Sequence, residues 1–306
     1  MSNSNLPKIS VIIPVYNTGE YIGAVLDDIC GQTLDGIEVI VVNDGSTDNS
    51  QEIIDGYCST HPEIIALKEE NKGQGAARNL ALRHAKGEFI YFMDSDDRLD
   101  KDALEKLYAK ASQNGLDLVL FDADTINDSD GPNFVYDRSA IVDTGRRWTG
   151  PELMKFELEN NCFYVSPCLM LVKKNIIDAF TDFPEGTIHE DNVLAVHVML
   201  TARNAMYMKD KFFHRRVSEN STMTTTYGMR NIYGYLAASK IILSWKNGVN
   251  DPLIDLFMKC TLDSVIWLAS AMPWKDKLRT YRMFRAAGIN KYVSRLHWLR
   301  LVLKRK

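Results

Sequence analysis

Two acidic groups in the sequence have the residue types and spacing of catalytic carboxylates. One is the D-S-D-D run at 94–97, directly after an apolar run, and the other is the H-E-D run at 189–191, directly before one. Residues two apart in an extended segment face the same way, so Asp94 and Asp96 can hold one divalent cation together. Mg²⁺ and Mn²⁺ take such oxygen ligands and neutralise the charge that grows on a diphosphate leaving group. A carboxylate such as Asp191 can act as a general base on a hydroxyl.

Each group also has a simpler structural explanation. Short acidic runs form polar turns, and Asp and Glu are favoured at helix N-termini as caps and through the helix dipole. For 94–97, the position after a buried strand and beside a loop suited to phosphate favours a ligand site. For 189–191, both explanations stay open on the residues alone.

The first third of the chain predicts alternating strands and helices. Near-continuous apolar runs are typical of strands buried on both faces, and apolar residues at helical spacing lie between them. This alternation indicates right-handed βαβ units, and therefore an α/β fold with a mostly parallel sheet flanked by helices. The expected strands are 9–15, 37–42, 64–67, 89–93 and 116–121, and the expected helices are 20–30, 49–58, 76–86 and 102–113.

Polar residues gather where the expected strands end, which is where open parallel sheets bind ligands. The first strand leads into Pro14 and Tyr16, the second into Asp44, and the fourth into 94–97. Asp44 can accept a hydrogen bond from a nucleobase, although N-D-G is also ordinary turn chemistry. Segment 71–78 opens a helix, whose free backbone N–H groups suit a phosphate. These positions predict a ligand-binding rim along one edge of the sheet.

Several other classes of protein lack support. The G-Q-G-A-A-R run at 73–78 places Arg78 where a dinucleotide fingerprint needs glycine, and no Walker A sequence occurs. The five widely spaced cysteines without C-x-x-C are typical of a reducing compartment. Residues 1–8 lack the apolar core of a secretory signal, and no apolar run reaches the length of a membrane span. We therefore expect a cytoplasmic enzyme.

The later part of the chain has a different pattern. Residues 122–147 predict a polar loop, 151–159 a helix, 163–172 a strand, 211–213 a short strand, and 227 onward only helices. The basic segment 214–222 concentrates cations and hydroxyls, which suits a phosphate contact, or forms a solvated loop. His214 in it is more often a packed residue than a metal ligand.

Charge is distributed unevenly along the 306 residues. The formal net charge is −4, but residues 274–306 carry eleven Lys and Arg against one acid, which leaves the first 273 residues at −14. In this tail, arginines alternate with aromatic residues and leucines, a pattern typical of a helix that lies on an anionic membrane surface. A helix docked on the acidic body explains the pattern nearly as well. The acidic body argues against nucleic-acid binding.

Four segments together resemble bacterial family 2 glycosyltransferases with the GT-A fold, which is Rossmann-like. They are ISVIIPVYN (9–17), VVNDGSTDNS (41–50), NKGQGAARN (71–79) and FMDSDD (92–97). The resemblance is dense over 8–105 and continues sparsely through HEDN (189–192) and HRRVSENST (214–222). It implies a nucleotide-sugar-binding half at 1–105, an acceptor-binding half at 106–226, and a C-terminal helical region at 227–306.

The resemblance also implies roles for individual residues. Asp191 matches the catalytic base of a Glu-Asp pair, with Glu190 beside it. The implied metal ligands are Asp94 and Asp96 of the D-x-D motif, with His214 as a further candidate. The loop from Arg215 to Thr222 resembles one that closes over the donor. The implied nucleotide-sugar site consists of Pro14, Tyr16, Asp44, Asn71, Lys72, Arg78, Asp94, Ser95 and Arg215.

The implied reaction is a single inverting displacement. Asp191 removes a proton from an acceptor hydroxyl, and the oxygen attacks the anomeric carbon on the face opposite the diphosphate. Mn²⁺ or Mg²⁺ stabilises the departing UDP. The implied partners are a UDP-sugar and a glycan or lipid-linked acceptor in bacterial surface polysaccharide synthesis. A homodimer through the C-terminal helices has no specific signal in the sequence.

Two departures from the family pattern and two alternative functions stay open. V-S-P-C-L at 165–169 stands where relatives often carry a W-N-K-like motif, and His214 stands where many have Tyr, so no sugar is assigned. A sugar-nucleotide-binding protein without transfer activity should lack the base or the metal motif. A nucleotidyltransferase that makes sugar nucleotides should carry a basic, glycine-rich loop after the first strand, where this chain has P-V-Y-N at 14–17.

Overall fold

The computed structural model describes residues 6–127, 135–217 and 226–303. Its main sheet has seven strands in the order β3-β2-β1-β4-β8-β6-β9. β3, β2, β1 and β4 are parallel, and β8 runs antiparallel to β4 and β6. The predicted α/β fold with a mostly parallel sheet is confirmed. The strands are β1 (Ile9–Val15), β2 (Ile37–Asp44), β3 (Ile64–Glu69), β4 (Phe89–Phe92), β6 (Leu118–Leu120), β8 (Met170–Lys173) and β9 (Ala205–Tyr207).

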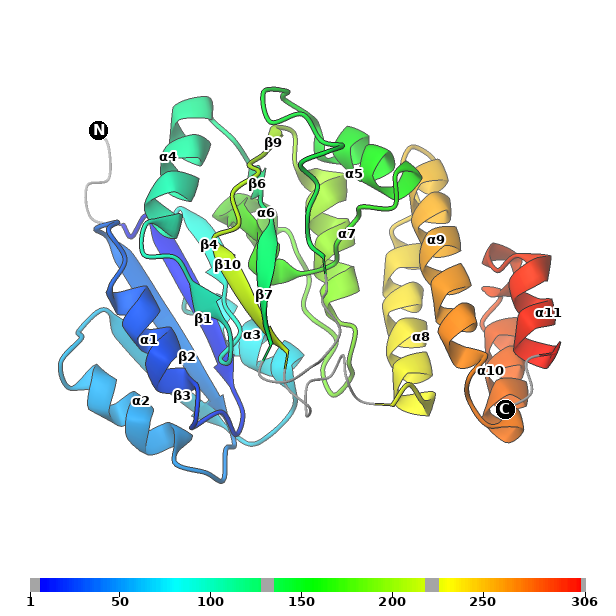
Figure 1. Ribbon diagram of the computed structural model, residues 1–306, viewed down its shortest axis with the longest axis horizontal. Coiled ribbons are helices and arrows are strands. Elements are labelled where there is room, and N and C mark those ends of the chain that lie inside the picture. Colours follow the sequence, from blue (N-terminus) through cyan, green and yellow to red (C-terminus); the bar gives the residue numbers. More distant parts are fainter. Residues whose placement is uncertain (1–5, 128–134, 218–225, 304–306) are drawn as a thin grey trace.

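Helices cover both faces of this sheet (Figure 1). Side chains along β1 alternate between two hydrophobic cores, with Val11 and Ile13 in one and Ile12 in the other. Because both faces are buried, the strand is apolar except at Ser10, whose buried hydroxyl donates to Glu38, and this explains the near-continuous apolar run. One core contains α1 (Ile22–Cys30), α2 (Ser50–Cys58) and α4 (Ala103–Asn114), and the other contains α3 (Gln74–Leu82), α5 (Gly150–Glu159), α6 (Lys174–Asp178) and α7 (Asp191–Thr201).

A second, three-stranded sheet forms beside the acidic turn that follows β4. Its order is β5 (Arg98–Leu99), β10 (Phe213–Val217), β7 (Ala123–Asn127), with β10 antiparallel to β5 and parallel to β7. The predicted polar loop is wrong over 123–127, and the short strand expected at 211–213 begins only at Phe213. Both strands form through pairing between distant segments, which leaves little periodic signal in either one.

Two smaller boundaries also differ from the prediction. The strand expected from residue 163 begins at Met170, because Pro167–Leu169 form a 3₁₀ turn and proline cannot donate to a ladder. The second helix begins at Ser50, one residue later than expected, and its N-cap residue Asn49 makes no side-chain cap hydrogen bond. Asp48 instead accepts a hydrogen bond from the Ser50 backbone N–H at 3.0 Å.

The C-terminal region is helical, as predicted. It lies at the end of the molecule away from β3 (Figure 1), yet its buried Phe257, Phe284 and Leu301 belong to the same core as Ile12 of β1. Within the described ranges, no helix is both long and apolar enough to span a membrane. The domain boundaries expected at 105 and 226 stay predictions. β4 lies before residue 105 and β8 lies after it, yet the two strands pair in one sheet. The helices are α8 (Met229–Ser244), α9 (Asp251–Ala269), α10 (Trp274–Ala286) and α11 (Arg295–Leu303), with a 3₁₀ turn at Asn290–Tyr292.

Gly234 lets α8 approach the segment that precedes the H-E-D run. A Cβ at position 234 would lie 2.1 Å from the Ile188 carbonyl oxygen, whereas a Cβ at Gly56 in α2 meets nothing within 4 Å. We expect Gly234→Ala to lower the free energy of unfolding by about 1–3 kcal/mol through overpacking. Gly56→Ala should raise it by about 0.5–1 kcal/mol because alanine favours the helix. Urea unfolding measures both, and equal stabilisation by the two changes would contradict this close packing.

Candidate active site

One buried guanidinium joins the two acidic groups. Arg78 lies in the first turns of α3, and its side chain is 1% exposed. Its Nη2 is 3.0 Å from Asp94 Oδ1. Its Nη1 is 3.1 Å from Glu190 Oε1 and 2.5 Å from Asp191 Oδ1. The acidic turn after β4 and the start of α7 therefore meet at one cation.

Aromatic rings enclose this cation. The Arg78 guanidinium carbon lies 5.9 Å from the ring centroid of Phe92 and 5.5 Å from that of Phe183. Asn79 fixes the second ring's backbone, because its side chain donates to the Phe183 carbonyl at 2.9 Å and accepts from the Phe183 N–H at 2.8 Å. Among side chains, only a planar guanidinium offers a charge and five donors in a fork that can serve three carboxylates at once.

The site has strongly shifted protonation equilibria. Burial opposes the charge of Arg78, but Asp191, Asp94 and Glu190 outweigh it and raise the arginine pKa. Burial also raises the pKa of Asp191, an effect that Arg78 opposes and the nearby Asp94 reinforces. For Glu190, burial and then Asp191 raise the pKa to about 7. The Asp191 side chain is still 30% exposed, so a hydroxyl can reach it.

The acidic turn is held in place by the second sheet. Asp97 Oδ1 accepts from the Arg216 backbone N–H at 2.7 Å, and Arg216 Nε donates to the Asp96 carbonyl at 3.0 Å. Asp97 is 3% exposed and so serves as an anchor. Burial and then Asp94 raise the pKa of Asp96 to about 6. The turn therefore concentrates carboxylates at a fixed position, which suits a cation.

The predicted metal ligands do not form a closed cage. In the described ranges, no three carboxylate, imidazole or thiol ligand atoms at this rim lie within 4.8 Å of one another. His214 Nε2 lies 2.8 Å from Asp100 Oδ1 across the β10–β5 pair, so that nitrogen is engaged. Mg²⁺ and Mn²⁺ commonly bind one or two protein carboxylates and complete their shell with phosphate oxygens and water. Asp94 and Asp96 fit that pattern, and a metal role for His214 stays a prediction.

The loop beside β2 is anchored by Asp44. Its two carboxylate oxygens accept from the backbone N–H groups of Lys72 and Gly73 at 2.8 and 2.9 Å. Lys72 Nζ lies 3.8 Å from Glu69, and the neighbouring Asn71 is exposed. Asp44 therefore shapes the loop, and its predicted contact with a nucleobase is an additional role that stays a prediction.

The other predicted donor residues take different positions. Tyr16 is 49% exposed at the end of β1, whereas Pro14 is buried inside that strand opposite Val42. Ser95 is 6% exposed and accepts a hydrogen bond from Thr18 Oγ1 at 3.0 Å. Arg215 Nη1 donates to the Tyr136 hydroxyl. The rest of the predicted closing loop, residues 218–222, lies outside the described residues.

The resemblance implies Arg78 as part of the nucleotide-sugar site, and the structure shows its side chain buried among carboxylates. The sequence did not indicate Gln74, whose Nε2 donates to Asp94 Oδ1 at 2.9 Å, or Tyr136, the partner of Arg215. The helical position of Gln74, four residues before Arg78, was the one available signal, because it puts both side chains on the same face of α3.

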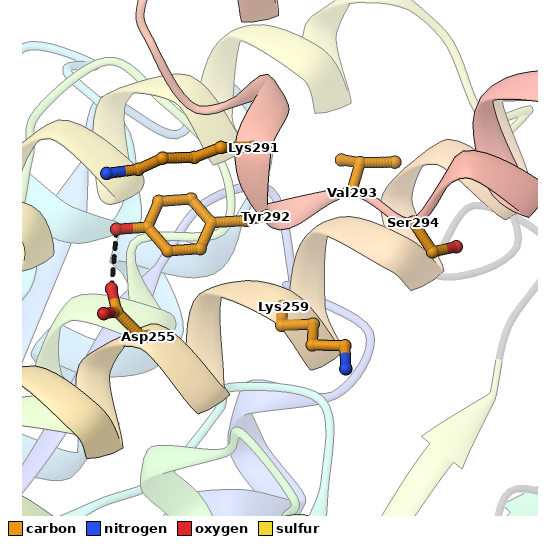
Figure 2. A pocket seen from close by; sticks show the side chains of 6 residues that line it. All are labelled: Asp255, Lys259, Lys291, Tyr292, Val293 and Ser294. Atoms are coloured by element: carbon orange, nitrogen blue, oxygen red, sulfur yellow. Dashed lines mark hydrogen bonds between the residues drawn. The ribbon is translucent and has the colours of Figure 1, made fainter.

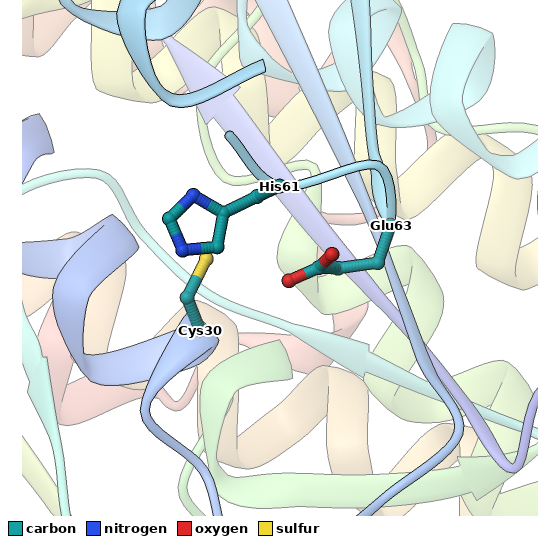
Figure 3. Close-up of side chains that lie close together, drawn as sticks. All are labelled: Cys30, His61 and Glu63. Atoms are coloured by element: carbon teal, nitrogen blue, oxygen red, sulfur yellow. The ribbon is translucent and has the colours of Figure 1, made fainter. Parts of the chain in front are cut away.

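A separate group of possible metal ligands consists of Cys30, His61 and Glu63 (Figure 3). It joins the C-terminal end of α1 to the segment between α2 and β3, so it lies at the amino edge of the sheet, opposite the rim. Burial and then Glu63 raise the pKa of Cys30 to about 11, so its thiol is protonated at neutral pH. This group takes no part in the candidate active site.

A family model described as "Glycosyl transferase family 2" matches residues 10–180. The chain belongs to glycosyltransferase family 2. The glycosyltransferase GlyG of Streptococcus pneumoniae serotype 4 is 32% identical over 230 residues, which cover 72% of this chain and 74% of GlyG. The poly(ribitol-phosphate) beta-glucosyltransferase of Bacillus spizizenii is 36% identical over 74% of this chain but only 35% of its own length, so this chain matches part of a longer protein there.

Solved structures show the same fold for this glycosyltransferase. Staphylococcus aureus TarS 1–349 in complex with UDP-GlcNAc has a TM-score of 0.64 and 22% identity, covering 93% of this chain and 89% of TarS 1–349. The mannosyltransferase PcManGT from Pyrobaculum calidifontis, in complex with GDP-Man and Mn²⁺, has a TM-score of 0.62 and 18% identity, covering 98% of this chain and 87% of PcManGT. At these identities the likeness concerns the GT-A fold alone.

Arg78→Met removes the cation that the three carboxylates share. We expect the free energy of unfolding at pH 7 to fall by about 3–5 kcal/mol, because buried charges lose their partner. The loss should be smaller at pH 5, where Glu190, whose pKa is raised to about 7, is protonated and no longer needs a cation. Arg98→Met is the matched control: Arg98 pairs with Asp28, and its side chain is 41% exposed, so about 1 kcal/mol or less is expected. If urea unfolding at pH 7 gave the two variants equal losses of unfolding free energy, Arg78 would not be the residue that holds the three carboxylates together.

Proposed function

We propose that this glycosyltransferase moves a sugar from a UDP-sugar to a hydroxyl of a bacterial surface glycan or lipid-linked acceptor, with inversion. The observation that carries the proposal is the meeting of Asp191 and Asp94 on Arg78. One side chain then holds the proposed base for the acceptor and a proposed carboxylate ligand of the diphosphate's metal ion beside each other. The UDP-GlcNAc bound to TarS and the ribitol-phosphate polymer named for the Bacillus spizizenii relative support the donor and acceptor classes.

Asp191 is the proposed general base. Arg78 donates to Oδ1, and the second carboxylate oxygen is able to take the proton of the attacking hydroxyl. The raised pKa of Asp191 makes it a stronger base than an ordinary aspartate, and the Arg78 guanidinium opposes part of that rise. Glu190 is 4% exposed and bound to the same guanidinium, so it is a positioning residue.

Asp94 and Asp96 are the proposed ligands of Mn²⁺ or Mg²⁺. Their oxygen donors suit a hard divalent ion. Burial and then Asp94 raise the pKa of Asp96, and Arg215 and Arg216 oppose this rise only in part. When bound, the ion neutralises charge on the diphosphate leaving group. The Mn²⁺ in the PcManGT complex supports this choice. Lys72, in the loop before α3, and Arg215, in β10, are proposed to contact the same phosphates.

The remaining parts of the proposal concern partners and place. We propose a cytoplasmic enzyme, peripheral to the inner face of the cell membrane when its acceptor is lipid-linked. Whether the donor sugar is a hexose or an N-acetylhexosamine is decided by the donor test below. The homodimer through the C-terminal helices stays a prediction.

A panel of UDP-sugars tests the proposed reaction. UDP release in Mn²⁺ should single out one donor. Asp191→Asn should lower transfer by about 10²–10⁴-fold, the usual contribution of a general base, while leaving UDP binding intact. Asp96→Ala should remove metal-dependent UDP binding itself. Asp35→Asn, at an exposed site, serves as the control. Normal transfer by Asp191→Asn would overturn the base, and tight metal-independent UDP binding would overturn the metal site.

The raised pKa of Asp96 predicts a pH dependence of metal binding. Below a pKa of about 6 this carboxyl takes a proton, and the proton competes with the ion. Mn²⁺ affinity should therefore be about tenfold weaker at pH 5 than at pH 7. Electron paramagnetic resonance with Mn²⁺ alone measures this and avoids the titration of UDP phosphates. An affinity that is the same at both pH values would contradict Asp96 as a ligand.

A further inference from the structure

Exposed apolar side chains concentrate in one part of the molecule. Of fifteen exposed large hydrophobic side chains in the described ranges, nine lie between residues 267 and 303. Monomeric proteins rarely display a large contiguous apolar surface without a partner that covers it. Residues 274–306 also contain eleven Lys and Arg but one acidic residue.

Three exposed leucines of α11 lie on one face. Leu296, Leu299 and Leu303 are spaced i, i+3, i+7 and are 72%, 57% and 71% exposed. The opposite face is docked: Leu301 is 1% exposed, and Trp298 packs edge-on against Phe284 at 5.9 Å between ring centroids. One side of the helix therefore packs on the body, and the other side presents leucines.

The segment before α11 fixes this orientation. The Tyr292 hydroxyl donates to Asp255 of α9 at 2.6 Å, beside a hollow that Lys259 and Lys291 also line (Figure 2). The Ser294 backbone N–H donates to Asp263, also in α9, at 2.7 Å. These bonds hold the leucine face outward as a rigid feature of the folded chain.

Helix α10 presents a similar stripe. Trp274, Leu278 and Tyr281 are spaced i, i+4, i+7 and are 58%, 38% and 38% exposed. The Tyr281 ring meets Trp298 of α11 at 5.1 Å between centroids, so the two helices are in direct contact. We call Leu296, Leu299 and Leu303 of α11 the C-terminal apolar face.

Cations accompany this face. Arg295 and Arg300 are exposed and flank the leucines of α11, and the Arg300 guanidinium lies 4.8 Å from the ring centroid of the half-exposed Trp267. Arg285 lies 5.9 Å from the Tyr281 ring in the same way. Arginines beside tryptophan, tyrosine and leucine match the boundary of a bilayer, where apolar side chains enter the acyl region and cations meet lipid phosphates.

We propose that the C-terminal apolar face docks on the surface of an anionic lipid bilayer. A second copy fits it less well, because a two-fold interface would bring the same cationic surface against itself. A phosphate backbone of nucleic acid would leave the leucines without a partner. Docking would bring the proposed transferase to a lipid-linked acceptor. Binding is measured without sugar transfer, so failure here leaves the proposed donor chemistry untouched.

Vesicle sedimentation of the full chain tests this. Vesicles of phosphatidylcholine with phosphatidylglycerol should bind the wild-type chain, more weakly at high salt, and pure phosphatidylcholine should bind it less. The triple change L296S/L299S/L303S should weaken binding by at least about tenfold. R295Q/R300Q should reduce the preference for anionic vesicles. V249S is the matched control, since Val249 is 86% exposed but lies between α8 and α9, outside the face.

Metal-dependent UDP binding and circular dichroism check that each variant is folded. No sedimentation of the wild-type chain, or equal binding by the triple variant, would overturn the proposal. A dimer in light scattering that becomes a monomer in the triple variant would assign the face to a second copy instead.

Discussion

The buried guanidinium of Arg78 is the interaction on which the site depends. A charge with 1% of its side chain exposed is stable only with excellent partners, and three carboxylates supply them. These carboxylates come from residues 94, 190 and 191, so about a hundred residues of intervening chain must return to the same point. Any arrangement that separates the acidic turn from α7 leaves buried charges unpaired. The geometry of the proposed base and the proposed metal ligand is therefore coupled through one side chain.

The rest of the rim is held by backbone contacts. Asp44 binds two N–H groups of the loop before α3, and Asp97 binds one in β10. In both cases a carboxylate from a strand end anchors a neighbouring segment. Acidic residues at this rim thus divide into anchors such as Asp44 and Asp97, which bind backbone N–H groups, and residues such as Asp96 and Asp191, which are proposed to bind a ligand or a proton.

The sequence predicted those features that depend on local pattern. Strands such as β1 are buried on both faces, so their apolar runs are unmistakable, and the motifs at their ends were found. β7 and the extent of β10 were not predicted, because their stability comes from pairing across about ninety residues. The contacts of Arg78 with three carboxylates were not predicted for the same reason, because nothing near position 78 indicates that residues 94 and 190 will lie beside it. In the C-terminal tail, the sequence showed the amphipathic pattern but not which side of the helix packs on the rest of the protein.

A crystal structure with UDP and Mn²⁺ would show whether Arg78 holds the proposed base and metal ligands together around the donor. We expect an anomalous Mn²⁺ signal beside Asp94 and Asp96, with the diphosphate bound to the ion and the uracil near Asp44. We also expect Asp191 to stay on Arg78 and to face the β-phosphate. A nucleotide bound away from the carboxyl ends of β1, β2 and β4, or Mn²⁺ held only by Cys30, His61 and Glu63, would contradict it.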